Sequence, residues 1–169
     1  MWITPIDNEK TFDKDFLLVT KTDLKGRITY ANRNFMDIVD MDEDTLIGHP
    51  HNIVRHPDMP KIIFKLLWEY LQKGEEIHAY VKNLSADGSY YWVLANVTPS
   101  YDNSTKESKI IGYHSSRRFP KEQSLAIIKP LYAKLLDAEK SGGIDASKKI
   151  IDNLLQEKGI SYDEFILSF

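Results

Sequence analysis

The chain has 169 residues and a formal charge of −3, with 42% of its residues hydrophobic and 28% charged. This composition is ordinary for a soluble globular protein, and the charge gives no electrostatic reason to expect binding to nucleic acid or to an anionic membrane surface. The sequence contains no cysteine, which excludes disulfides, thiolate metal ligands and cysteine nucleophiles. No apolar run approaches the roughly 20 residues of a membrane-spanning helix, and the N-terminus lacks a signal-peptide pattern.

The residue pattern divides the chain into a polar leader at 1–15, a compact domain at 16–118 and a helical extension at 119–169. The domain begins with strand formers at 16–20, and turn residues before 27–30 indicate a β-hairpin. The period then changes to short helical pieces, the second of which Asp42 can cap.

A longer helix is predicted over 58–73, because its apolar residues recur at helical spacing. Asp58 is a plausible N-cap, Pro60 suits the first turn and Gly74 ends the helix. Three strands follow, at 77–84, 90–98 and 109–115, and the first two are joined by a turn at Asp87-Gly88. Two strands, several helices and three strands predict an α+β domain with a five-stranded antiparallel sheet and helices on one face.

The extension reads as helical, with a kink or restart expected at Pro130 and a break at Ser141-Gly142-Gly143. Ser161 and Glu164 form a capping-box pattern near the end. The closing apolar residues either fold back on the domain or supply part of an interface; they are Phe165, Ile166, Leu167 and Phe169.

A block of nine residues, Asn52-Ile53-Val54-Arg55-His56-Pro57-Asp58-Met59-Pro60, resembles the signature of PAS domains from Aer-type energy-taxis (aerotaxis) receptors. Shorter matches occur around it in the family's order and spacing, over about residues 20–135. They are Thr22-Asp23-Leu24, Ala31-Asn32, Phe64, Trp68, Lys73-Gly74, Val81-Lys82-Asn83, Asp87-Gly88, Tyr91-Trp92-Val93, Ala95-Asn96, Ile111-Gly112-Tyr113 and Pro130-Leu131-Tyr132.

The resemblance implies a PAS fold that holds FAD non-covalently and uses the flavin redox state as its signal. It implies a non-catalytic sensor in bacterial taxis rather than an enzyme. The sequence shows no membrane anchor, HAMP segment or signalling coiled coil, so it is similar to the soluble PAS proteins of two-part systems. We therefore expect a cytoplasmic protein, recruited to the inner face of the membrane by a separate methyl-accepting-type transducer with a HAMP segment. A homodimer is a further arrangement that the resemblance leaves open.

Within the matching block, Arg55 and His56 are candidates for contacting the cofactor. An Arg guanidinium can hold a dinucleotide pyrophosphate with paired hydrogen bonds, and His can add a donor. The alternative for both is an ordinary surface loop. Asp58 is a further candidate, although a helix cap would also explain it.

Other candidates could form the walls of a flavin pocket. Asn32 and Asn83 could hydrogen-bond the polar edge of an isoalloxazine ring, because an amide offers a donor and an acceptor. Asn32 could instead cap a helix, whereas Asn is disfavoured in a strand, which strengthens Asn83. Aromatic walls are expected from Phe64, Trp68 and Trp92, each of which could also be plain core; Tyr91, Asn96 and Tyr113 are weaker candidates.

One position departs from the family: Ile77 stands where many members carry a Trp that can lie against the flavin. The departure keeps open a cofactor-free adaptor, and FMN is an alternative to FAD. A haem sensor is also open, with His78 or His114 as the iron ligand. Strand alternation places His78 and Ile77 on opposite faces, so both cannot point into one pocket. No metal-ligand spacing, phosphate loop or nucleophile motif accompanies these residues.

Overall fold

The computed structural model describes residues 2–169, which form five strands, five α-helices and one 3₁₀-helix. The sheet is antiparallel and has the order β2-β1-β5-β4-β3, which confirms the predicted α+β architecture. In chain order the elements are β1 (Leu18–Asp23), β2 (Ile28–Ala31), α1 (Arg33–Val39), α2 (Glu43–Leu46), η1 (His51–Val54), α3 (Lys61–Gln72), β3 (Ile77–Leu84), β4 (Tyr90–Asp102), β5 (Lys109–Arg118), α4 (Glu122–Lys158) and α5 (Tyr162–Leu167).

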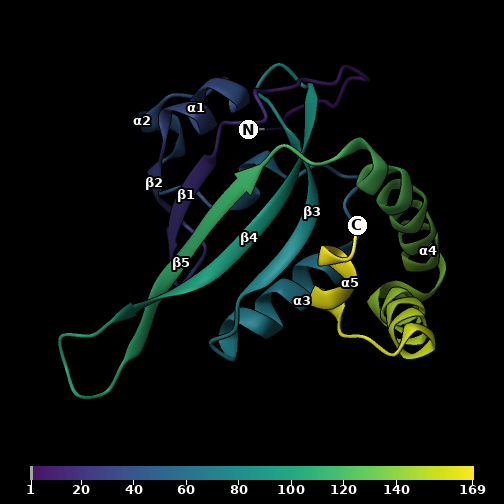
Figure 1. The fold of residues 1–169 in the computed structure, drawn as a ribbon. Helices are drawn as coiled ribbons and strands as arrows, with labels where there is room; N and C mark the ends of the chain where they lie inside the picture. The colour runs from purple at the N-terminus through teal and green to yellow at the C-terminus, as the bar shows by residue number, and fades with distance from the viewer. Residues whose placement is uncertain (1) are drawn as a thin grey trace.

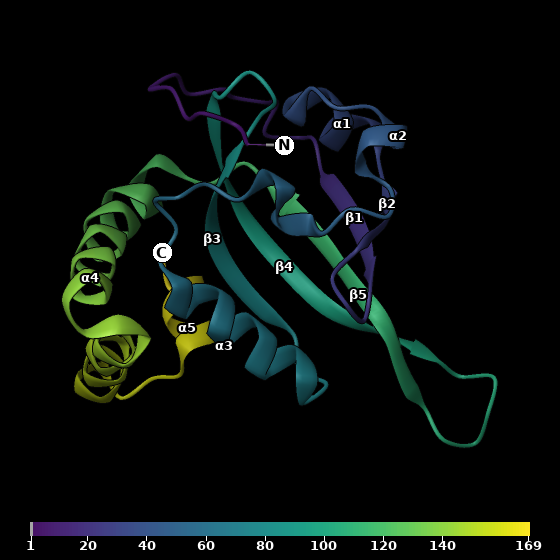
Figure 2. The same cartoon turned by 180° about the vertical axis from the view of Figure 1, so that it is seen from behind.

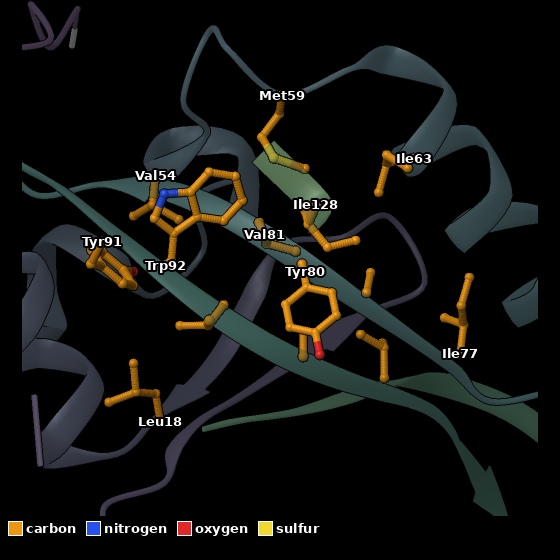
Figure 3. Packing of buried hydrophobic residues seen from close by; sticks show 14 of the residues in the cluster. Leu18, Val54, Met59, Ile63, Ile77, Tyr80, Val81, Tyr91, Trp92 and Ile128 are labelled. Atoms are coloured by element: carbon orange, nitrogen blue, oxygen red, sulfur yellow. The ribbon is translucent and has the colours of Figure 1, made fainter. Parts of the chain in front are cut away.

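The sheet has helices on its inner face, where α1, α2, η1 and α3 lie (Figures 1 and 2). The helices α4 and α5 lie beside the β3 edge of the sheet (Figure 1). Buried apolar side chains from all these layers form one continuous core (Figure 3). The side chains with the largest volume that are fully buried include Tyr80, Tyr91 and Phe35.

Two of the predicted caps are confirmed at the short helices. Asn32 caps α1, because its side chain accepts a hydrogen bond from the Phe35 amide. Asp42 caps α2 by accepting from the Thr45 amide.

The N-cap predicted for α3 is wrong. The cap position is Pro60, which offers no side-chain acceptor, and Asp58 instead pairs with Lys82 at 2.8 Å. The acceptor comes from α4: the Glu139 carboxylate receives the amides of Lys61 at 2.9 Å and Ile62 at 3.0 Å. A helix N-terminus needs acceptors for its free amides, and here a residue distant in sequence supplies them.

The extension packs onto the domain along the free edge of β3. The His78 amide donates to Asp163 of α5 at 2.7 Å, and the Tyr80 carbonyl accepts from the Tyr132 hydroxyl of α4 at 2.6 Å. Farther along the strand, the Lys82 amide contacts the Met59 sulfur at 3.2 Å. An edge strand presents unpaired backbone groups, so these contacts cover the edge that would otherwise be free.

The break predicted at Ser141-Gly142-Gly143 is confirmed, because Gly143 has a φ of 68° and a ψ of −165° inside α4. The interruption predicted at Pro130 is wrong, since the helix continues through that residue. Pro130 has no amide to donate to the Ala126 carbonyl, and both residues lie on an exposed part of the helix. The predicted capping box of Ser161 and Glu164 is present.

The segment before β1 is held against the turn between β3 and β4. The Ile6 amide donates to the Gly88 carbonyl at 2.9 Å, and the Lys10 amide donates to the Tyr90 carbonyl at 2.7 Å. Gly88 has a φ of 89°, and a Cβ there would lie 2.2 Å from the Thr4 carbonyl oxygen. Within residues 2–169, no helix is long and apolar enough to cross a bilayer.

Candidate cofactor-binding cavity

A cavity of about 250 Å³ lies between the inner face of the sheet, η1 and α3. Strand alternation supplies its floor, since residues two apart on one strand share a face. These floor residues are Val81 and Asn83 of β3, Ala95 and Val97 of β4, and Tyr113, Ser115 and Arg117 of β5. The volume is slightly below the roughly 300–1,000 Å³ that is common for small-molecule sites.

The floor contains a buried guanidinium. Arg117 is only 5% exposed, yet it pairs with no carboxylate among residues 2–169. Its Nη2 donates to His51 Nε2 at 2.7 Å and to Thr20 Oγ1 at 2.9 Å. Burial lowers the pKa of Arg117 to about 10, which still leaves the group charged at neutral pH.

His51 is therefore an acceptor at Nε2, because a guanidinium can only donate. Burial, followed by the adjacent Arg117 charge, lowers the pKa of His51 to about 3. A neutral imidazole with its proton on Nδ1 can accept at Nε2 from Arg117 and from the Thr20 hydroxyl, which lies 3.1 Å from the same nitrogen. The cavity thus contains a fixed cation and a neutral histidine beside it.

Several polar atoms in this region are buried without a hydrogen-bond partner among the described residues. They are Nη1 of Arg117, Oγ of Ser115 and the Tyr91 hydroxyl. A buried polar group left unpaired costs about 1–3 kcal/mol, and more when it is charged. Arg117 and Ser115 both line the cavity, so a ligand with acceptor atoms would satisfy groups that the protein leaves unpaired.

Aromatic side chains form the wall opposite the sheet. Phe64 and Trp68 project from α3 into the cavity lining, and the Trp68 ring meets Tyr113 edge-on with centroids 5.3 Å apart. The β1–β2 turn closes against the same indole, since a Cβ on Gly26 would lie 3.5 Å from the Trp68 ring. The walls therefore suit a flat, largely apolar ring.

The structure brings together Arg55, Phe64, Trp68 and Asn83 of the predicted site residues, all of which line the cavity. The Arg55 guanidinium lies over the Phe64 ring, 3.8 Å from its centroid. Partial burial of its guanidinium lowers the pKa of Arg55. Among the weaker candidates, Tyr113 also lines the cavity.

His56 and Asp58 of the matching block have partners outside the cavity lining. His56 is buried, and its Nδ1 accepts from the Asp58 amide at 3.0 Å. Burial and the Lys82 charge lower the pKa of His56. Asp58 is exposed, and its hydrogen bond from Lys82 lowers its pKa. Both residues shape the loop that precedes α3.

The remaining predicted residues also lie outside the lining. Asn32 ties the start of α1 to β1, because its side chain accepts from the Val19 amide at 3.0 Å and donates to the Leu17 carbonyl at 2.9 Å. Ile77 is fully buried opposite Val97. Trp92 packs toward α4, with its ring 6.0 Å from that of Tyr132.

Both histidines considered as haem ligands face away from the cavity. His78 hydrogen-bonds Asp163 of α5 through Nδ1 at 3.0 Å. His114 lies between Tyr113 and Ser115, which both line the cavity, so alternation directs it to the other face. His51 is the histidine of the lining, and its Nε2 is engaged by Arg117.

Arg117 and His51 line the cavity but are not among the site residues predicted from the sequence. A signal existed for Arg117: it lies on the same side of the last strand as Tyr113, four residues farther on. No local pattern connects it to His51, because the two positions are 66 residues apart in the chain.

The comparisons with known proteins agree with the fold. The family described as the PAS fold matches residues 28–114. The Escherichia coli aerotaxis receptor is 41% identical over 145 residues, which is 86% of this chain and 27% of the receptor. The biofilm dispersion protein BdlA of Pseudomonas aeruginosa is 28% identical over 94 residues, covering 55% of this chain and 22% of that protein. The chain thus spans about a quarter of the length of these relatives.

Solved structures share the fold at low sequence identity. The light-state structure of the blue-light photoreceptor Aureochrome1 LOV has a TM-score of 0.59 at 19% identity, covering 67% of this chain and 88% of that chain. A PAS domain from Colwellia psychrerythraea has a TM-score of 0.55 at 19% identity, covering 62% and 86%. The chain belongs to the PAS family, and its PAS domain is of the type found in aerotaxis receptors.

Proposed function

We propose that the protein is a non-catalytic redox sensor for bacterial energy taxis, which binds FAD non-covalently in the cavity and signals by contact with another protein. The observation that carries the proposal is Arg117, a buried cation that faces the cavity without a carboxylate partner among residues 2–169. A charge in this position is costly unless a bound group compensates it.

The residues present fit a flavin. The polar edge of an isoalloxazine carries carbonyl oxygens and ring nitrogens, which match the unpaired Nη1 of Arg117 and Oγ of Ser115. Asn83 offers an amide donor and acceptor on the same floor. Phe64 and Trp68 supply apolar walls for the ring. A cavity of about 250 Å³ holds one part of a dinucleotide and leaves the rest at the opening.

When bound, the flavin supplies a group whose charge and hydrogen-bonding pattern change on reduction. The protein's part is to hold that group and respond to it. Arg117 favours added negative charge at the ring, and its contacts connect the floor to η1 through His51 and to β1 through Thr20. A change in what the ring accepts would bias these contacts, and a partner that prefers one arrangement would read the difference.

We propose that helix α3 transmits the change from the cavity to the helical extension. This helix carries Phe64 and Trp68 in the cavity wall and is capped by Glu139 of α4. In this proposal the partner that responds to the signal is a membrane-bound chemoreceptor-type transducer with a HAMP segment on a separate chain. The protein itself is cytoplasmic and is recruited to the membrane by that partner. The match to an aerotaxis receptor, which covers 27% of that receptor, supports a role in taxis signalling.

The test is the visible spectrum of the purified protein, followed by release and identification of the pigment. Flavin absorption bands and released FAD are the expected result. A Soret band would show that the protein binds haem and not flavin. A colourless protein that gains no bands on incubation with FAD would support the alternative of a cofactor-free adaptor. Asn83→Ala should lower flavin occupancy or shift the reduction potential, and unchanged values would remove Asn83 from the site.

A further inference from the structure

The opening of the cavity carries cations without acidic partners. Lining residues that are exposed mark where the cavity reaches the surface, and they include Lys25, Asn52 and Arg55. No Asp or Glu occurs among the described residues of the lining. Neither Lys25 nor Arg55 forms an ion pair with a carboxylate of residues 2–169.

The two cations come from different segments that are tied together. Lys25 lies in the β1–β2 turn, where the Asp23 carboxylate accepts the amides of Lys25 at 2.9 Å and Arg27 at 3.0 Å. The His51 amide donates to the Gly26 carbonyl at 2.9 Å, which fixes this turn beside the segment that leads to Arg55. The opening therefore has a rigid frame, and the Lys25 side chain is free to reach toward a ligand.

The cationic side chains of the cavity lie at two levels, one in the floor and one at the opening. Arg117 is buried in the floor, whereas Lys25 and Arg55 are exposed at the opening. A ligand that contacts both the floor and the opening must carry hydrogen-bond acceptors on the part inside the cavity and negative charge on the part at the opening. A flavin nucleotide has this distribution, because its ring is flat and its phosphates lie at the end of the ribityl chain. Phosphate oxygens are suited both to the Arg fork and to a Lys ammonium.

We infer that Lys25 and Arg55 form a phosphate-binding pair at the opening, and that Lys25 makes the cavity select flavins by the number of their phosphates. This inference rests on the proposed function. The affinity should increase from riboflavin, with no phosphate, to FMN, with one, and to FAD, with two. Salt should weaken FAD more than riboflavin, since contacts between exposed charges are screened.

The experiment titrates the ligand-free 169-residue chain with riboflavin, FMN and FAD at low and high salt, with flavin fluorescence as the readout. Lys25→Met should weaken FAD binding roughly threefold to tenfold and leave riboflavin unchanged, because one charged contact at a partly screened site is lost. Lys25→Arg should restore the FAD affinity. Lys21→Met is the matched control, since Lys21 is exposed on β1 and lies outside the cavity lining.

The outcomes separate the two proposals. If no flavin binds to the unmodified protein, the proposed function fails, and this inference fails with it. If flavins bind but Lys25→Met leaves the preference for FAD over riboflavin intact, the inference alone is overturned. An equal loss for all three ligands also overturns it, because the substitution would then act on the turn rather than on a phosphate contact.

Discussion

Arg117 determines much of what the cavity can hold. The guanidinium is buried beside His51 and Thr20, and one of its nitrogens has no partner among the described residues. Arg117→Met keeps most of the side-chain volume and removes the charge. We expect flavin affinity to fall about tenfold or more, because a hydrogen bond to a charged group contributes about 1.5–3 kcal/mol. Fluorescence titration measures this.

Arg118→Met is the control for this substitution, since Arg118 is the exposed neighbour on the same strand. It should bind flavin as the unmodified protein does. If Arg117→Met and Arg118→Met bind flavin equally well, the buried cation does not contact the ligand. Arg117 would then no longer support the proposal of flavin binding.

His51 makes folding stability depend on pH. Its pKa is about 3 in the folded protein, whereas an unfolded histidine titrates near 6.5. The unfolded chain therefore binds a proton first as the pH falls, and stability is lost from about pH 6.5 down to about pH 3. Between about pH 7.5 and about pH 5.5 this one group should cost about 1.4 kcal/mol.

Urea unfolding of His51→Gln at these two pH values checks the expectation, since Gln cannot titrate. The variant should lose about 1.4 kcal/mol less than the unmodified protein over the interval. His49→Gln makes the same chemical change at an exposed position and serves as control. Equal losses in the unmodified protein and in His51→Gln would show that His51 is not held neutral.

At the scale of elements, Glu139 links the cavity wall to the helical extension. Its carboxylate accepts the Lys61 and Ile62 amides at the start of α3 and the Ser147 hydroxyl at 2.9 Å. Glu139→Gln leaves a single neutral acceptor oxygen. We expect the free energy of unfolding to fall by about 1–2 kcal/mol, as for the loss of an N-cap.

Thermal or urea unfolding of Glu139→Gln measures that loss. Asp137→Asn is a matched change on the same helix, at an exposed ion pair that contributes little. Its stability should stay within about 0.5 kcal/mol of the unmodified protein. If the two variants lose the same amount, the long-range cap does not stabilise α3.

The same helix shows what the sequence could and could not reveal about elements. The apolar period predicted α3, and strand formers predicted β3 with its observed bounds of Ile77–Leu84. These signals are local, so they can be read from neighbouring residues. The cap is not local: Asp58 has the right residue type at the right place, but Lys82 pairs with it and Glu139 takes its role.

For the whole molecule, part of the cavity lining could be predicted from the sequence, because only some of its residues belong to a local pattern. The matching block supplied Arg55, and pattern together with resemblance supplied Phe64, Trp68 and Asn83, all of which line the cavity. The floor depends on pairing between strands distant in sequence. Arg117 is placed opposite Leu18 and Ala95 by the register of β5, and no single segment contains that information.

The extension completes the molecule by covering the β3 edge, and its apolar end folds back rather than remaining free. Tyr162, Phe165 and Ile166 are buried, and Phe169 stacks on Tyr80 with ring centroids 6.0 Å apart. A chain ended after residue 141 loses these side chains and Asp163. Each buried apolar side chain contributes about 1.5–3 kcal/mol, so unfolding should need less urea by a wide margin.

The shortened chain should also self-associate. Without Asp163 the His78 amide is unpaired on an exposed strand edge, and such edges pair with other chains. Light scattering over a range of concentrations measures the effect. Asp163→Ala in the full chain separates the two causes, because it frees the amide but keeps the apolar cover. A shortened chain that stays monomeric and unfolds like the full one would show that the extension is not part of the folded core, which would leave it available to a partner.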